Sequence, residues 1–398
     1  MSQIIGSRVL NFVIHLTPNI NPYQATADYV DTFLLPCPLP SWSLYVQGFL
    51  VLELIIMFLQ SAYIIYRRSK TKKMYHISLN AVGLIQLDRA NHCGLCYLLY
   101  SIFAVAEIVC YQFAQSGHLD EGWPNFLLGI KVLVSIACAR VILWLCICHF
   151  IFVRQRAVSE NLAPKGRLLS TTATWALNIF LVIIILVPSA VIVTVCSQLT
   201  HEYGRVRQVV MPVTQHLRDL AHNCTSGTCS VTHVASQVIV LARVMHHIDR
   251  LVYDTTVSVY FYVLCDALTF LFYVPFVYLL FQSFKTQRGL DHSTKRQTGG
   301  VFSNTVIELA MIFLRVVLGA CTIRLIRNGE FIVDANFWLI LRIGIPSTIS
   351  TLGNITLFLI LDSLRKNDNI DPASRISLSR FPRLMPIGTY KSDGNSSV

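Results

Sequence analysis

Eight ionisable side chains lie inside long apolar stretches of this sequence, and their chemistry is the first question that it raises. In chain order they are Glu53, Glu107, Lys131, Arg140, Asp266, Glu308, Arg315 and Arg342. A charged side chain in the hydrocarbon of a membrane costs several kcal/mol unless it is paired or hydrated. Residues of both signs fall at overlapping depths, so they can face one another inside a helix bundle.

Two interpretations of these residues stay open. In the first, they form ion pairs and hydrogen bonds that fix helix register, with Glu308 and Arg315 two turns apart on one helix face. In the second, a polar cavity open to the outside binds a small ligand. The residues that would line this cavity are Glu107, Lys131, Arg140, Asp266 and Arg342.

The elements that must position these side chains are seven long apolar stretches. A helix needs about 20 mostly apolar residues to cross the roughly 30 Å hydrocarbon core of a bilayer. The stretches are Ser41–Tyr66, His92–Gln115, Asn125–Phe152, Thr171–Cys196, Ser258–Gln282, Val301–Leu325 and Asn336–Leu361. They predict an all-α fold, a polytopic membrane protein built as a bundle of seven transmembrane helices.

The composition agrees with lipid as the solvent. Of the 398 residues, 54% are hydrophobic and 13% are charged, and the mean hydropathy is +0.56. Soluble domains carry about 25% charged residues. The net charge of +11 would suit nucleic-acid binding, but the Lys and Arg residues are spread over short connectors. Basic connectors are typical of the cytoplasmic side of a membrane protein, so we expect no nucleic-acid partner.

The basic residues also predict the orientation. The connectors after the first, third and fifth stretches contain six, four and four Lys or Arg residues, whereas the short connectors after the second and sixth contain only Arg327. This asymmetry predicts a multi-pass plasma-membrane protein whose N-terminus is extracellular. Residues 1–40 would be an extracellular tail, 41–361 the seven-helix domain and 362–398 a cytoplasmic tail. In the first tail, Ile4–Leu16 is either an amphipathic surface segment or poorly ordered.

The connector 197–257 is the second extracellular loop in this topology, and its apolar residues predict a helical hairpin. In its second half Val234, Val238, Leu241, Met245, Ile248 and Val252 recur every three or four residues, and in its first half Val206, Val209, Val213, Leu217 and Leu220 do the same. Each series forms one apolar helical face. The second arm is expected to run into the fifth membrane span.

The centre of this loop carries signs of extracellular chemistry. Asn223 heads an N-glycosylation sequon, which is modified only on the lumenal side. Cys224 and Cys229 can bridge to each other, Cys37 can bridge to one of them, or no bridge forms, because connectivity does not follow from sequence. The loop histidines lack the spacing and the acidic partner of a helical zinc site, so no metal is expected.

The architecture resembles that of a G-protein-coupled receptor from about Ser41 to Leu361. Class motifs of the rhodopsin-like receptors are absent, since the third span ends with His149-Phe150-Ile151-Phe152 in place of an acidic-Arg-aromatic triplet. The chain looks more like a divergent branch, such as the nematode serpentine chemoreceptors. The stretch Lys73–Asn80 is similar to their junction before the second span, which would then begin nearer Ile77. The seventh span has no lysine for a retinal Schiff base, which excludes an opsin or a light-driven pump.

The resemblance implies a chemosensory receptor with an extracellular small-molecule or peptide ligand and a heterotrimeric G protein as partner. The residues that would face the G protein are Arg154, Arg156, Lys285 and Arg288. The alternative is a transporter or channel, but the chain has no internal repeat and an odd number of spans. An enzyme is not expected, because the histidines do not cluster near one membrane face, and no cofactor is implied. Pro188, Pro275 and Pro346 predict kinks in three spans.

Overall fold

The structure of this chain is a computed structural model. It describes residues 11–16, 20–34, 39–71, 78–79, 83–116, 119, 122–161, 170–224, 234, 245–286, 292–327 and 334–368. Six of the predicted site residues have no described side chain. They are Cys37, Cys229, Arg154, Arg156, Lys285 and Arg288.

The described chain is a helix bundle with one small antiparallel ladder. Its helices are α2 (Pro22–Leu34), α3 (Ser43–Lys70), α4 (Arg89–Gln115), α5 (Gly122–Asn161), α6 (Thr171–His222), α8 (Met245–Thr286), α9 (His292–Arg327), α10 (Ala335–Leu339), a π-helical turn (Ile340–Gly344) and α11 (Ile345–Asp368). The strands are β1 (Ser78–Leu79) and β2 (Ile85–Gln86). Seven of these helical segments are long and apolar enough to cross a membrane, α10 and α11 counting as one. The predicted all-α, seven-helix bundle is confirmed.

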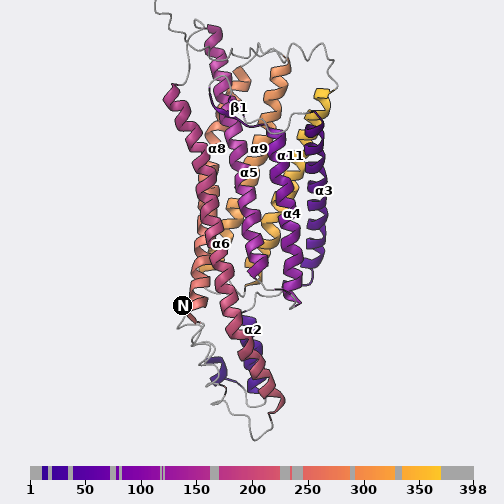
Figure 1. Ribbon diagram of the computed structural model, residues 1–398, viewed down its shortest axis with the longest axis vertical. Helices are drawn as coiled ribbons and strands as arrows, with labels where there is room; N and C mark the ends of the chain where they lie inside the picture. Colours follow the sequence, from indigo (N-terminus) through magenta and orange to yellow (C-terminus); the bar gives the residue numbers. More distant parts are fainter. Residues whose placement is uncertain are drawn as a thin grey trace, which may run out of the picture.

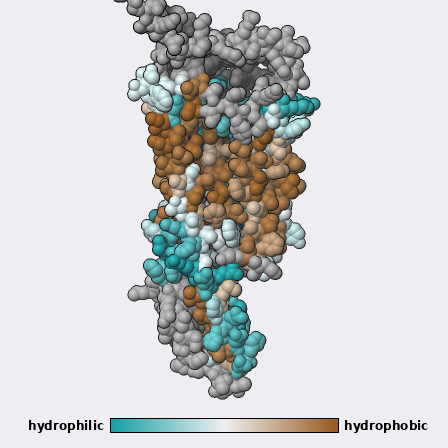
Figure 2. All heavy atoms as spheres, viewed as in Figure 1, coloured by the Kyte–Doolittle hydropathy of each residue, from teal (hydrophilic) through white to brown (hydrophobic). Residues whose placement is uncertain are grey.

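Helix α5 lies at the centre of the bundle. It packs against α4, α6, α8 and α9, while α3 and α11 contact each other and close the ring. Its side chain Trp144 is fully buried, whereas large apolar residues such as Phe49, Leu271 and Phe358 are exposed on the outside. Figure 2 shows a hydrophobic band on one face of the bundle, with hydrophilic residues on either side of it. Apolar side chains on the outside of a bundle are expected where the surrounding solvent is hydrocarbon.

The two ends of the bundle differ in structure. One end carries α2 and the last part of α6, and the other carries β1; we call them the α2 end and the β1 end (Figure 1). Helix α6 has 52 residues, which at 1.5 Å per residue gives a length of about 78 Å. It therefore extends far beyond a hydrocarbon core of roughly 30 Å. The first arm of the predicted hairpin is thus no separate helix but the continuation of the fourth span.

From Met245 on, the second arm of the hairpin agrees with the prediction, while Val238 and Leu241 lie outside the described residues. Helix α8 begins at Met245, within the loop, and continues without a break through the fifth span. The apolar faces of the two arms meet in a second core, which we call the hairpin core. Its buried members are Val13, Tyr23, Ala27, Val30, Val206, Val210, Leu217, Val234, Val252, Val259, Ile326, Phe337 and Trp338.

Helix α2 was not expected within the N-terminal tail. Its residues Tyr23, Ala27 and Val30 are buried against α6, and their spacing of four and three residues is that of one helical face. Arg218 on α6 forms an ion pair with Asp31 on α2. This segment is short and only half apolar, so hydropathy alone did not distinguish it from a tail.

The second span begins where hydropathy placed it. Helix α4 starts at Arg89, after the β1–β2 ladder, and the Asp88 carboxylate caps it by accepting from the Asn91 backbone N–H at 3.1 Å. The ladder needs a turn in which Gly83 adopts a φ of 90°, a conformation that glycine adopts without a Cβ penalty. The alternative start near Ile77, implied by the chemoreceptor resemblance, is wrong.

Candidate functional site

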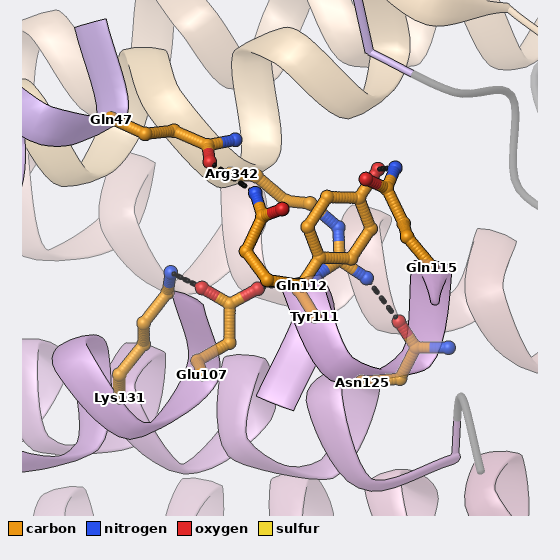
Figure 3. A network of polar contacts seen from close by, with 8 residues as sticks. All are labelled: Gln47, Glu107, Tyr111, Gln112, Gln115, Asn125, Lys131 and Arg342. Carbon is orange, nitrogen blue, oxygen red and sulfur yellow. Dashed lines mark hydrogen bonds and ion pairs between the residues drawn. The ribbon is translucent and has the colours of Figure 1, made fainter. Parts of the chain in front are cut away.

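Three of the five predicted cavity residues meet in one buried cluster between α4, α5 and the π-helical turn. The Lys131 ammonium donates to Glu107 Oε2 at 2.8 Å, and Arg342 Nη1 donates to the other oxygen, Oε1 (Figure 3). The side chains of Glu107, Lys131 and Arg342 are 1%, 2% and 3% exposed. We call these three residues the Glu107 cluster. It joins the second, third and seventh spans.

The local sequence explains how each side chain reaches the cluster. Glu107 lies on the buried face of α4, three residues after Ala104 and one turn before Tyr111. Arg342 lies in the π-helical turn, where the Ile345 N–H donates to the Ile340 carbonyl five residues back. Pro346 follows this turn and has no N–H to offer the Arg342 carbonyl, so the regular helical ladder cannot form there. Single π-helical turns of this kind are frequent at functional sites.

Aromatic rings surround the Arg342 guanidinium. Its central carbon lies 4.0 Å from the centroid of the Tyr111 ring and 5.1 Å from that of Trp338. Such cation–π contacts stabilise a desolvated guanidinium by about 2 kcal/mol. Trp338 also belongs to the hairpin core. The hairpin and the Glu107 cluster therefore share a side chain.

Neutral polar side chains lead from the cluster toward the α2 end. Arg342 Nη2 donates to Asn125 Oδ1 at 2.8 Å, and Gln112 Nε2 donates to Gln47 Oε1 at 2.8 Å. Asn125 and Gln112 are partly exposed and Gln115, one turn further along α4, is exposed. Figure 3 shows these amides grouped around Arg342 and Tyr111. Polarity thus continues from the buried charges to the end of the helices.

The other two predicted cavity residues lie elsewhere. Asp266 on α8 pairs with Arg315 on α9, whose Nη2 lies 3.0 Å from Asp266 Oδ1. Arg315 also donates through Nη1 to Ser135 on α5. Glu308 does not pair with Arg315 and instead accepts from the Tyr97 hydroxyl at 3.4 Å. Asp266 is therefore not part of the Glu107 cluster.

Arg140 has a backbone partner. Its guanidinium donates from α5 to the Ile184 carbonyl on α6. Ile184 precedes Pro188 by four residues, so its carbonyl lacks the N–H that would bond to it in a regular helix. Proline in a membrane helix is tolerated where a neighbour satisfies the freed carbonyl. Arg140 fulfils that structural role.

Glu53 occupies a third polar position, between α3 and α11. It accepts hydrogen bonds from the hydroxyls of Ser350 and Thr351, the latter at 2.9 Å, and its backbone carbonyl accepts from Asn354 Nδ2 at 3.0 Å. Asn354 heads one of the sequons, and its amide is engaged inside the bundle. This arrangement holds the first and seventh spans together.

Sequence reasoning missed several parts of the site. Tyr111, Trp338 and Asn125 contact Arg342, but aromatic and amide residues in a span give no signal distinct from ordinary packing. The only available signal was their helical spacing: Tyr111 lies four residues after Glu107, and Trp338 four residues before Arg342.

The cysteines and possible metal ligands give a simpler picture. Cys224 is disulfide-bonded, and both of its predicted partners lie outside the described side chains. No group of His, Cys, Asp or Glu residues suited to a metal ion occurs among the described residues. Comparison of the chain with family models, curated proteins and solved structures finds no match in any of the three. Its function therefore has to be inferred from its own residues.

Proposed function

We propose that this protein is a plasma-membrane receptor that senses an extracellular small-molecule or peptide ligand and signals to a heterotrimeric G protein. The observation that carries the proposal is the position of α5. This central helix bears Lys131 of the Glu107 cluster and, 13 residues nearer the β1 end, Trp144. At 1.5 Å per residue the two lie about 20 Å apart along the helix.

The sidedness of the proposal rests on charge. The connectors that belong to the β1 end carry fourteen Lys or Arg residues, against the one at Arg327 in the short connectors of the α2 end. Short-loop basic residues are retained in the cytoplasm. The α2 end, with Asn223 and the disulfide-bonded Cys224, would then be extracellular. A ligand would approach the Glu107 cluster through the polar residues at that end.

Trp144 of α5 ties this helix to the connector between the first two spans. The Trp144 indole N–H donates to the Ile85 carbonyl at 2.8 Å, while the Ile85 N–H donates to Asn178 Oδ1 at 3.0 Å. Asn178 also holds the Gly83 carbonyl at 3.0 Å. A movement of α5 or α6 would therefore be transmitted to the β1–β2 turn, beside the basic connectors that a G protein would contact.

A ligand changes this arrangement only if it binds one helix packing more tightly than the other. The Glu107 cluster offers such a difference, because its two ion pairs connect three helices and both use the same carboxylate. A ligand that competes for Lys131 or Arg342 would release α5 or the π-helical turn from α4. The proposal thus assigns the trigger to a change of partner within one buried cluster.

The test is nucleotide exchange on heterotrimeric G proteins by cells expressing the full chain. A panel of small water-soluble acids, amines and neutral esters is screened, and surface expression is measured in parallel. Activation by at least one compound, lost in the Lys131→Met variant at equal surface expression, is the expected result. Transmembrane current or uptake of the compound without G-protein activation would instead identify a channel or a transporter and overturn the receptor proposal.

A further inference from the structure

The Glu107 cluster has an excess of positive charge. Lys131 and Arg342 share the single carboxylate of Glu107, and all three side chains are almost completely buried. The nearest further partners of Arg342 are the neutral Asn125 and the rings of Tyr111 and Trp338. A buried charge without a counterion is costly in a low-dielectric interior. Among the residues that the structure describes, the cluster is therefore short of one negative charge.

The cluster also has unused hydrogen-bond donors. Arg342 Nε is buried and has no partner among the described residues. Nε lies on the edge of the guanidinium that also carries Nη2, which is bonded to the amide oxygen of Asn125. The Lys131 ammonium has three donors, of which one goes to Glu107. Within the described part of the chain, donors without a partner thus belong to the two cations that share one carboxylate.

We propose that the Glu107 cluster binds a small organic acid, whose carboxylate bonds to the Nε–Nη2 edge of Arg342 and to Lys131. A guanidinium edge with two N–H groups matches the two oxygens of a carboxylate, which gives geometric specificity as well as charge. The ligand carboxylate would take the place of the Asn125 oxygen and compete with Glu107. The amides from Asn125 and Gln112 to Gln115 form the polar approach from the α2 end.

This inference rests on the proposed receptor function for its biological meaning, but it makes a prediction of its own about Glu107. Glu107 is an internal competitor of the ligand for both cations. Glu107→Gln keeps the shape of the side chain, removes the competing charge and leaves two cations for the ligand. Carboxylate binding should therefore become tighter in this variant. A residue that only holds helices together would not produce such a gain.

The experiment measures the melting temperature of the purified full-length protein in detergent at constant ionic strength. The probes are acetate, butyrate, benzoate and octanoate, each compared with its neutral amide and with chloride. At least one carboxylate should raise the melting temperature in a saturable manner, and its amide and chloride should not. Glu107→Gln should lower the apparent Kd of that carboxylate at least tenfold, and Lys131→Met should raise it at least tenfold, the scale expected for a charge-assisted hydrogen bond.

The matched control is Glu53→Gln, the same change in another membrane helix, outside the cluster. It should leave the apparent Kd within twofold of the original. Stabilisation by none of the four carboxylates, equal stabilisation by an amide or chloride, or an unchanged Kd in Glu107→Gln would each overturn the inference. Because no G protein takes part, failure here removes the acid site alone, whereas absence of G-protein activation removes the receptor proposal alone.

Discussion

Arg140 offers the sharpest test of how this bundle is held together. Arg140→Met removes the guanidinium that donates to the Ile184 carbonyl and leaves that carbonyl without a donor, because Pro188 has no N–H. Hydrogen bonds to charged groups contribute about 1.5–3 kcal/mol, so we expect a loss of about 2 kcal/mol in the free energy of unfolding. Pro188→Ala supplies an N–H to the same carbonyl. In that background the cost of Arg140→Met should fall by about 1 kcal/mol or more.

The assay is reversible unfolding in mixed micelles with increasing denaturing detergent, applied to the four members of this double-mutant cycle. Pro275→Ala provides the control background, since Pro275 lies in α8 and its missing N–H does not concern the Ile184 carbonyl of α6. There the cost of Arg140→Met should be unchanged. Equal costs in the original and the Pro188→Ala backgrounds would refute the assignment of Arg140 to the freed carbonyl.

Three further results are expected. Asp266→Leu leaves Arg315 buried without its carboxylate and should lower the free energy of unfolding by about 3–5 kcal/mol in the same assay. Adding Arg315→Met should recover a large part of this loss. A further loss in the double variant would contradict the prediction. Glycosidase treatment should remove a glycan that Asn223→Gln abolishes and Asn354→Gln does not, since Asn354 bonds within the bundle; absence of a glycan at Asn223 would contradict the proposed orientation. Trp144→Phe, which loses the hydrogen bond to the β1–β2 turn, should weaken G-protein activation at least threefold without changing ligand affinity; an equal change in affinity would place Trp144 at the ligand site.

The number and position of the spans followed from hydropathy because hydrocarbon thickness sets a minimum length for each apolar stretch. The helix ends did not follow so well. After Cys196 the sequence turns polar, with Glu202 and Arg205, so the fourth apolar stretch ended there although α6 continues to His222. Hydropathy detects the end of the lipid-facing part of a helix. Beyond that point a helix keeps the periodic spacing of its apolar residues, but its mean hydropathy falls. For the same reason, mean hydropathy does not reveal α2 within the N-terminal segment.

The charged residues of the spans were evident from the sequence, but their partners were not. Sequence position gives the depth of a residue in the membrane, whereas pairing also requires the direction in which each helix faces. Asp266 and Lys131 lie at similar depth, yet Asp266 faces α9 and bonds Arg315, and Lys131 faces α4 and bonds Glu107. A ring of seven helices allows many such pairings at equal depth, so only the packing could separate the two clusters.

Nearby prolines explain why Arg140 and Arg342, each inside a predicted span, have different partners. Pro188 frees a carbonyl on a helix that faces Arg140, so the guanidinium of Arg140 is used to complete a backbone ladder. Pro346 follows the π-helical turn that carries Arg342 itself. That turn presents the guanidinium to a carboxylate, an amide and two rings, and leaves Nε without a partner among the described residues. The proline of α6 therefore engages Arg140 as a hydrogen-bond donor to the freed carbonyl. The proline after the π-helical turn makes no such demand on Arg342. On this ground Arg342, and not Arg140, belongs to a site that can exchange partners.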